Sequence, residues 1–108
     1  MGTIAAKRTG TRRVGVDGYV FDVLMRDLVG HDRSPATFLV YLYFWGRAHG
    51  KERQRVAASY QEIAEATGLS KSGAQGAVRR LLRRQLVWVV KRQPTAVPEY
   101  RIARPWRR

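Results

Sequence analysis

The segment Ser59–Arg84 reads SYQEIAEATGLSKSGAQGAVRRLLRR, and it predicts two helices that meet at a sharp turn. Ser59 and Glu62 have the spacing of a capping box, in which each side chain satisfies a free amide at a helix start. The helix that they open ends at Gly68, because glycine enters the left-handed conformation at little cost. Ser70 then caps a second helix, expected over 71–84. The pattern within 59–85 is therefore helix, glycine turn and capped helix.

The second helix carries two glycines in its first turns, although an interior glycine costs a helix about 1 kcal/mol relative to alanine. Its inward face holds an apolar stripe of Ala74, Ala77, Val78, Leu81 and Leu82. At 100° per residue, the outward face collects Ser72, Gln75, Gly76, Arg79 and Arg83, with Gly73 on the flank. Two interpretations of the glycines stay open: a partner approaches the outward face closely, or the helix packs tightly against a neighbouring helix.

Two stretches after this helix have the composition of strands. They cover 86–92 (LVWVVKR) and 99–104 (EYRIAR), and the prolines of 93–98 (QPTAVP) are typical of a turn between them. A β-hairpin is therefore expected. The alternating residues are Trp88 and Val90 in the first stretch, against Tyr100 and Ile102 in the second.

A long apolar helix is expected upstream. Ser34 and Pro35 form a start signal, with serine as the N-cap and proline at the first helical position. The helix over 35–48 is apolar nearly all round, so it must be buried on more than one side, either in the core or in a dimer contact. One face is predicted to hold Phe38, Leu39, Leu42 and Trp45.

The remaining segments give weaker patterns. Residues 1–16 are rich in glycine, threonine and arginine without apolar periodicity, which predicts a mobile basic arm. Residues 19–29 predict a short extended entry followed by about two helical turns, and 56–58 predict a brief strand. At 108 residues the chain is expected to form one domain over 17–108. The tail residue Trp106 docks on the core, clamps a partner or stays loose; the sequence leaves all three open.

The charge is strongly and unevenly basic. There are 21 Lys and Arg residues against 8 Asp and Glu, a net charge of +13, which favours a polyanionic partner. From Ser70 onward the only acid is Glu99, whereas four acids lie in the first third of the chain. The longest apolar run, 38–45, is too short to cross a bilayer, and we expect no membrane partner. The lack of cysteine suits a reducing, cytoplasmic location, where a DNA-binding protein would associate with the nucleoid.

The sequence offers no catalytic or metal-binding constellation. It lacks a nucleophile elbow, a phosphate-binding loop and a cysteine nucleophile. His31 and His49 stand alone, without the partners that a metal site requires. We therefore expect no enzyme activity, no catalytic residue, no metal, no cofactor and no small-molecule ligand.

The residues YQEIAEATGLSKSGAQGAVR (60–79) resemble the helix-turn-helix family, with Ala64 at the helix crossing, Gly68 in the turn and Leu69 after it. Together with the expected hairpin, the chain over 33–105 resembles the winged-helix branch found in small bacterial and phage regulators and in replication-initiator domains. The implied fold is mostly α with a small β-hairpin: a three-helix core with a helix-turn-helix at 59–85 and a wing at 86–104.

The resemblance implies that the second helix of the motif enters the major groove of double-stranded DNA. The expected base-contacting residues are Ser72, Gln75, Gly76 and Arg79. The expected phosphate-contacting residues are Ser70, Lys71, Arg80, Arg83, Lys91 and Arg92.

The implied function is sequence-specific DNA binding by a transcriptional regulator. Because one helix reads few base pairs, a homodimer is expected, with the apolar surplus of 19–45 as its contact. Two alternatives stay open: the DNA-binding domain of a plasmid or phage replication initiator, and a winged-helix module that binds RNA or protein.

Overall fold

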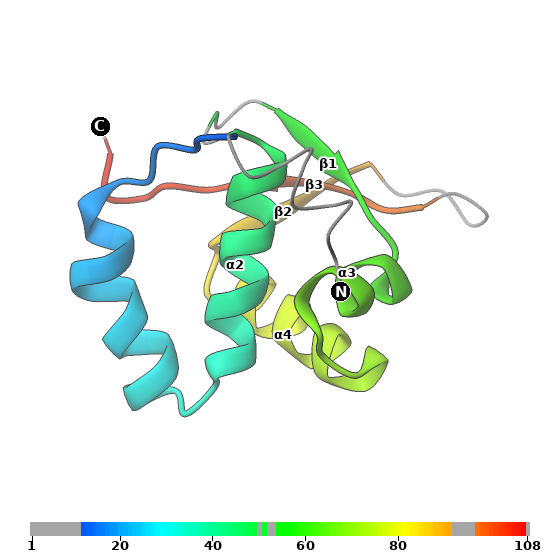
Figure 1. Ribbon diagram of the computed structural model, residues 1–108, viewed down its shortest axis with the longest axis horizontal. Coiled ribbons are helices and arrows are strands. Elements are labelled where there is room, and N and C mark those ends of the chain that lie inside the picture. Colours follow the sequence, from blue (N-terminus) through cyan, green and yellow to red (C-terminus); the bar gives the residue numbers. More distant parts are fainter. Residues whose placement is uncertain (1–11, 50, 52–53, 92–96, 108) are drawn as a thin grey trace.

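The structure is a computed structural model that describes residues 12–49, 51, 54–91 and 97–107. In these residues the fold is mostly helical, with a small antiparallel sheet of three strands, as Figure 1 shows. The elements, with η denoting π-helical segments, are η1 (Val20–Leu24), η2 (Arg26–His31), α2 (Pro35–Arg47), β1 (Arg55–Ala57), α3 (Tyr60–Thr67), α4 (Lys71–Arg83), β2 (Val87–Lys91) and β3 (Glu99–Ile102).

The first helical segment consists of η1 and η2. The Met25 amide donates to the Val20 carbonyl, five residues earlier, which is the π-helical pattern. Val20, Leu24 and Leu28 are buried, so apolar side chains at every fourth position hold the segment on the core. The extended entry expected in 19–29 is wrong, because the backbone is already helical at Tyr19.

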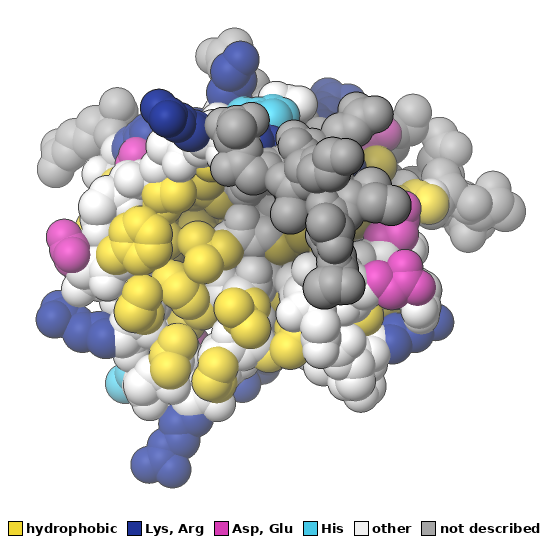
Figure 2. Space-filling model, viewed as in Figure 1, with side chains coloured by type: hydrophobic (Ala, Val, Ile, Leu, Met, Phe, Trp, Pro, Cys, Tyr) yellow, Lys and Arg dark blue, Asp and Glu magenta, His cyan; other side chains and the backbone are white. Residues whose placement is uncertain are grey.

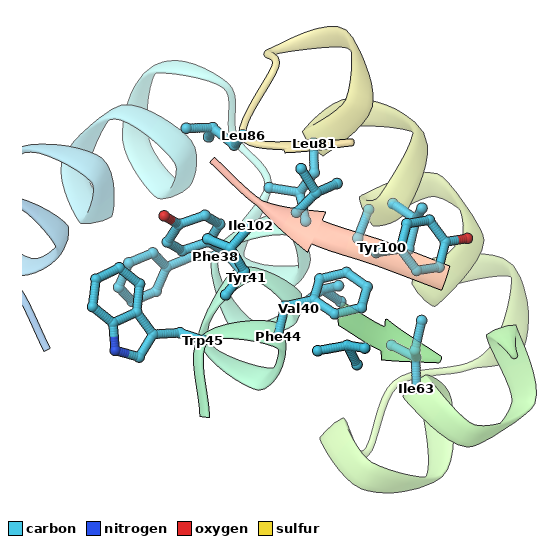
Figure 3. Close-up of a cluster of buried hydrophobic side chains, with 14 of the residues drawn as sticks. Phe38, Val40, Tyr41, Phe44, Trp45, Ile63, Leu81, Leu86, Tyr100 and Ile102 are labelled. Carbon is cyan, nitrogen blue, oxygen red and sulfur yellow. The ribbon is translucent and has the colours of Figure 1, made fainter. Parts of the chain in front are cut away.

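Helix α2 is the central element of the core. The Ser34 hydroxyl accepts a hydrogen bond from the Thr37 amide at 3.3 Å, which confirms the expected N-cap. The helix contacts η2, α3 and α4, and the Phe44 ring lies 5.1 Å from the Tyr100 ring of the sheet. Figure 3 shows its side chains meeting those of the sheet and of α4. The expected burial on more than one side is observed for Phe38, Trp45, Val40 and Phe44, whereas Leu39, expected on the same face as Phe38 and Trp45, is 43% exposed.

The sheet has the strand order β1-β3-β2, and both neighbouring pairs are antiparallel. The β2–β3 pair is the hairpin that the sequence predicts. The brief strand expected near 56–58 is β1, which pairs along the other edge of β3. The hairpin is therefore joined through residues 99–101 of β3 to the segment that precedes α3.

The predicted alternation in β2 is wrong by one residue. Trp88, expected opposite Tyr100 and Ile102, is 48% exposed on the outer face of the sheet, where the Arg101 guanidinium lies 5.2 Å from its ring centre. A shift of one residue moves every side chain of a strand to the other face. The observed pairs are Val87 with Ile102, Trp88 with Arg101, and Val89 with Tyr100.

The amino-terminal end of the described chain packs against the core. The Trp45 indole donates to the Gly15 carbonyl at 2.7 Å, and Val14 and Val16 are partly buried. The expectation of a mobile arm is therefore wrong for 12–16, because these apolar side chains have a core to bury against. Residues 1–11, the rest of that predicted arm, lie outside the described residues.

The carboxyl-terminal tail docks on the same end of the molecule. The Trp106 ring stacks on Tyr19 at 4.5 Å, and its indole donates to Asp17 at 2.8 Å. Arg107 also donates to Asp17, from its Nε atom at 2.7 Å. Of the three roles open for Trp106, docking on the core is the one observed.

Candidate nucleic-acid interface

Helices α3 and α4 are joined by a short turn whose ends are capped as the sequence predicts. The Glu62 amide donates to the Ser59 hydroxyl at 3.1 Å, and the Ser59 amide donates to the Glu62 carboxylate at 2.8 Å. Gly68 ends α3 with φ at 81°, in the left-handed region that favours glycine. The Ser70 hydroxyl accepts from the Gly73 amide at 3.0 Å and so caps α4. These contacts fix the angle at which α4 leaves the turn.

Helix α4 has one buried face and one solvent face. The buried side chains include Ala74, Val78 and Leu81, which pack against α2 and α3. The four residues predicted to contact bases lie together opposite this face, with Gln75 half-buried and the others exposed. The residues along the exposed edge, which we call the outward stripe, are Ser72, Gly76, Arg79 and Arg83.

The two glycines of α4 differ in their surroundings. A Cβ atom added at Gly73 would lie 3.0 Å from the Ser70 hydroxyl oxygen, so the N-cap itself favours glycine there. A Cβ atom added at Gly76 would find no heavy atom within 4 Å outside its own part of the helix. The glycine at position 73 is therefore explained by the N-cap of α4 and not by tight packing against a neighbouring helix. No contact within the described fold explains the glycine at position 76.

Several arginines of the carboxyl-terminal half pair with acids from the first third of the chain. Arg84 lies 3.5 Å from Asp27 and 3.3 Å from Asp32, and Arg107 binds Asp17. Ion pairs within the fold therefore account for part of the uneven charge distribution of the sequence. Arg84 and Arg107 hold the amino-terminal segment onto the end of α4 and onto the tail.

The pKa values of two of these acids, Asp32 and Asp17, are lowered. A hydrogen bond to His31, together with the charges of Arg84 and Arg80, holds the pKa of Asp32 below its usual value of 3.8. Hydrogen bonds from Arg107 and Trp106 lower the pKa of Asp17 to about 2.

The other cations of α4 are not neutralised in this way. Within the described ranges, no carboxylate forms an ion pair with Lys71, Arg79 or Arg83, and all three side chains are exposed. A hollow of about 230 Å³ adjoins Lys71, between the start of α3 and Pro98 at the turn end of the hairpin. The solvent face of α4 therefore carries unpaired positive charge at its first residue and again at Arg79 and Arg83.

The hairpin is described only in part. β2 ends at Lys91, which pairs with Glu99, and only the backbone of Lys91 is described. Arg92, the other predicted phosphate contact of the hairpin, lies outside the described residues. Both assignments remain predictions.

Sequence reasoning missed the structural roles of Arg84 and Arg107. The acids in the first third of the sequence indicated that some arginines could form ion pairs. The sequence did not indicate which arginine pairs with which acid. Among the described residues, no group of three or more His, Cys, Asp or Glu side chains is arranged to hold a metal ion. None of the described helices has the length and apolar character needed to cross a membrane.

No protein-family model, no curated protein and no solved structure matches this chain.

Proposed function

We propose that this protein is a winged-helix regulator that binds double-stranded DNA in a sequence-dependent manner. In this proposal α4 enters the major groove and the β2–β3 hairpin is the wing that lies beside it. The observation that carries the proposal is the outward stripe of α4. The stripe is exposed, and its two arginines have no ion-pair partner among the described residues. Near its middle lies Gly76, which has no side chain.

The dimensions suit such an interaction. A B-DNA major groove about 12 Å wide admits a helix whose diameter with side chains is about 10–12 Å. Because little room is left, a residue without a side chain at the centre of the inserted edge allows closer approach. Gly76 occupies that position, and nothing inside the protein accounts for it.

The residues proposed to contact bases, which are Gln75 and three members of the outward stripe, have distinct chemical roles in this proposal. Gln75 pairs with the N6 and N7 atoms of adenine, and Arg79 with the O6 and N7 atoms of guanine. Ser72 supplies a further hydrogen bond to a base edge, and Gly76 allows the approach. The residues proposed to contact phosphates and set the register are Ser70, Lys71, Arg80, Arg83, Lys91 and Arg92.

The test begins with selection of bound duplexes from a random pool, followed by binding measurements on the enriched sequence. Arg79→Ala and Gln75→Ala should each reduce the preference for that sequence by about 1–3 kcal/mol at one base position. Arg83→Ala should weaken binding to all duplexes alike. With about six phosphate contacts, affinity should fall by roughly 10³ between 50 and 200 mM salt.

Competition separates DNA binding from the other functions that such a fold supports. A labelled duplex of the selected sequence serves as the probe. Unlabelled duplex DNA of the same sequence should displace it at far lower concentration than double-stranded RNA or single strands. If RNA competes better, or if all three alanine variants bind like the wild type, the proposal is wrong. A second selection, from genomic fragments, separates the two regulatory roles, because origin repeats among the bound fragments would identify a replication initiator in place of a transcriptional regulator.

A further inference from the structure

A second surface of the molecule is apolar and has no described partner. Phe21, Met25 and Val29 project from η1 and η2 at every fourth position, and Leu39 projects from α2. These side chains are 36–47% exposed, although each is large and hydrophobic. Figure 2 shows hydrophobic side chains gathered over this pair of helical segments. We call these four residues the apolar face.

Charges of both signs border this face. Asp22 and Arg26 follow Phe21 and Met25 in the sequence, and both are exposed. In the part of the chain that the structure describes, neither has an ion-pair partner. The face thus combines an apolar centre with an acid and a base placed one helical turn apart.

We propose that the apolar face binds the same face of a second copy of this chain about a two-fold axis. In such a contact each residue pair occurs twice, so a surface must be complementary to itself. With the η1–η2 segments antiparallel, Phe21 packs near Val29 of the partner subunit. Asp22 then lies near Arg26 of the partner subunit, and Arg26 near Asp22 of the partner subunit. One acid and one base on each copy satisfy both symmetric contacts.

The size of the molecule is compatible with a second copy on this face. Its extents are 37, 36 and 27 Å, so two touching copies have centres roughly 27–37 Å apart. Half-sites one helical turn apart on DNA are separated by about 34–36 Å. This spacing argument rests on the proposed function. The outward stripe of α4 belongs to different residues, so one molecule can use both surfaces at once.

The first experiment measures the mass of the full chain by sedimentation over a concentration series, without DNA. The wild type should form a dimer. Val29→Lys, in the apolar face, should raise the dimer dissociation constant about tenfold or more, because it places a charge in a desolvated contact. Val97→Lys is the matched control, because Val97 is similarly exposed but lies outside the face. It should leave the dimer unchanged.

The second experiment tests the symmetric charge contacts. Asp22→Arg alone and Arg26→Asp alone should each weaken self-association, since each places like charges opposite one another. An equal mixture of the two variants should restore dimers, because one copy then presents only bases and the other only acids.

Three results would overturn the proposal: a monomer at every concentration, an equal effect of both valine substitutions, or no rescue in the mixture. If removal of residues 1–11 turns a monomer into a dimer, the chain's own amino-terminal segment is the occupant. Because no DNA is present, failure here leaves the proposed DNA contact of α4 unaffected.

Discussion

Replacing Gly76 with alanine separates the stability of the fold from its binding function. Gly76 lies in the interior of α4, and an added Cβ atom meets no heavy atom within 4 Å. The substitution should therefore raise the free energy of unfolding by about 0.8–1 kcal/mol, the difference between the two residues in a helix interior. For a domain of this size, that corresponds to an increase in melting temperature of about 4 °C or more.

The same substitution should weaken DNA binding. If the centre of the outward stripe lies against the floor of the groove, an added methyl group forces a shift that costs about 1–3 kcal/mol, as overpacking does in protein cores. The dissociation constant should then rise between about 5-fold and about 150-fold. Thermal unfolding and fluorescence anisotropy with the selected duplex measure the two effects on the same preparation.

Gly46→Ala is the matched control. Gly46 is also a helical glycine with no heavy atom within 4 Å of an added Cβ, but it lies in α2. It should stabilise the fold without changing the affinity. If Gly76→Ala is stabilised and binds DNA as tightly as the wild type, the close approach at this position is refuted.

Two further predictions concern the arginine pairs. Arg84→Ala should lower the free energy of unfolding, measured by denaturant titration, by about 1–2 kcal/mol, because the Asp32 side chain is only 8% exposed and loses its arginine partner. Arg83→Ala should leave the free energy of unfolding unchanged. It should instead reduce the salt slope of DNA binding by about 1. Equal stability losses in the two variants would contradict the assignment. The pKa of Asp17 is about 2, so its contact with Arg107 stabilises the fold fully above about pH 4, and this contribution is lost as the pH falls towards 2. Asp17→Asn should therefore lower the free energy of unfolding by roughly 1 kcal/mol at pH 6 and by clearly less at pH 2. The effect at pH 6 is small because Arg107 is half-exposed and solvent screens the pair. A loss of stability independent of pH would show that the charge of Asp17 is not the cause.

The local signals in the sequence were sufficient to predict the helix starts and the turn. Ser34, Ser59 and Ser70 are N-caps, and Gly68 takes the left-handed conformation that its position between two helices requires. These features depend on residues within one helical turn of each other. They are therefore readable without knowing the rest of the fold.

Features set by distant contacts were not predictable in the same way. The choice of the face of β2 that is buried depends on its pairing with β3, and Trp88 was accordingly assigned to the wrong side. The π-helical form of η1 and η2 had no counterpart in the sequence pattern, and of these two segments η2 makes extensive contact with α2. Arg83 and Arg84 are adjacent and chemically identical, yet one is exposed on the stripe and the other pairs with Asp27 and Asp32.

The contrast between these neighbours also defines the candidate site. Counting positive charges in the sequence overestimates the cationic surface, because part of that charge is used within the fold. The exposed cations of α4 that have no described ion-pair partner are Lys71, Arg79 and Arg83, and the last two belong to the outward stripe.

The central claim is that the outward stripe of α4 lies against the groove of duplex DNA. Backbone amide shifts, followed by NMR while the selected duplex is added to the labelled protein, test this claim most directly. We predict that the largest changes occur at Ser72, Gln75 and Arg79, with smaller changes along the β2–β3 hairpin. Changes concentrated on η1, η2 and the exposed side of α2, with α4 unperturbed, would contradict it.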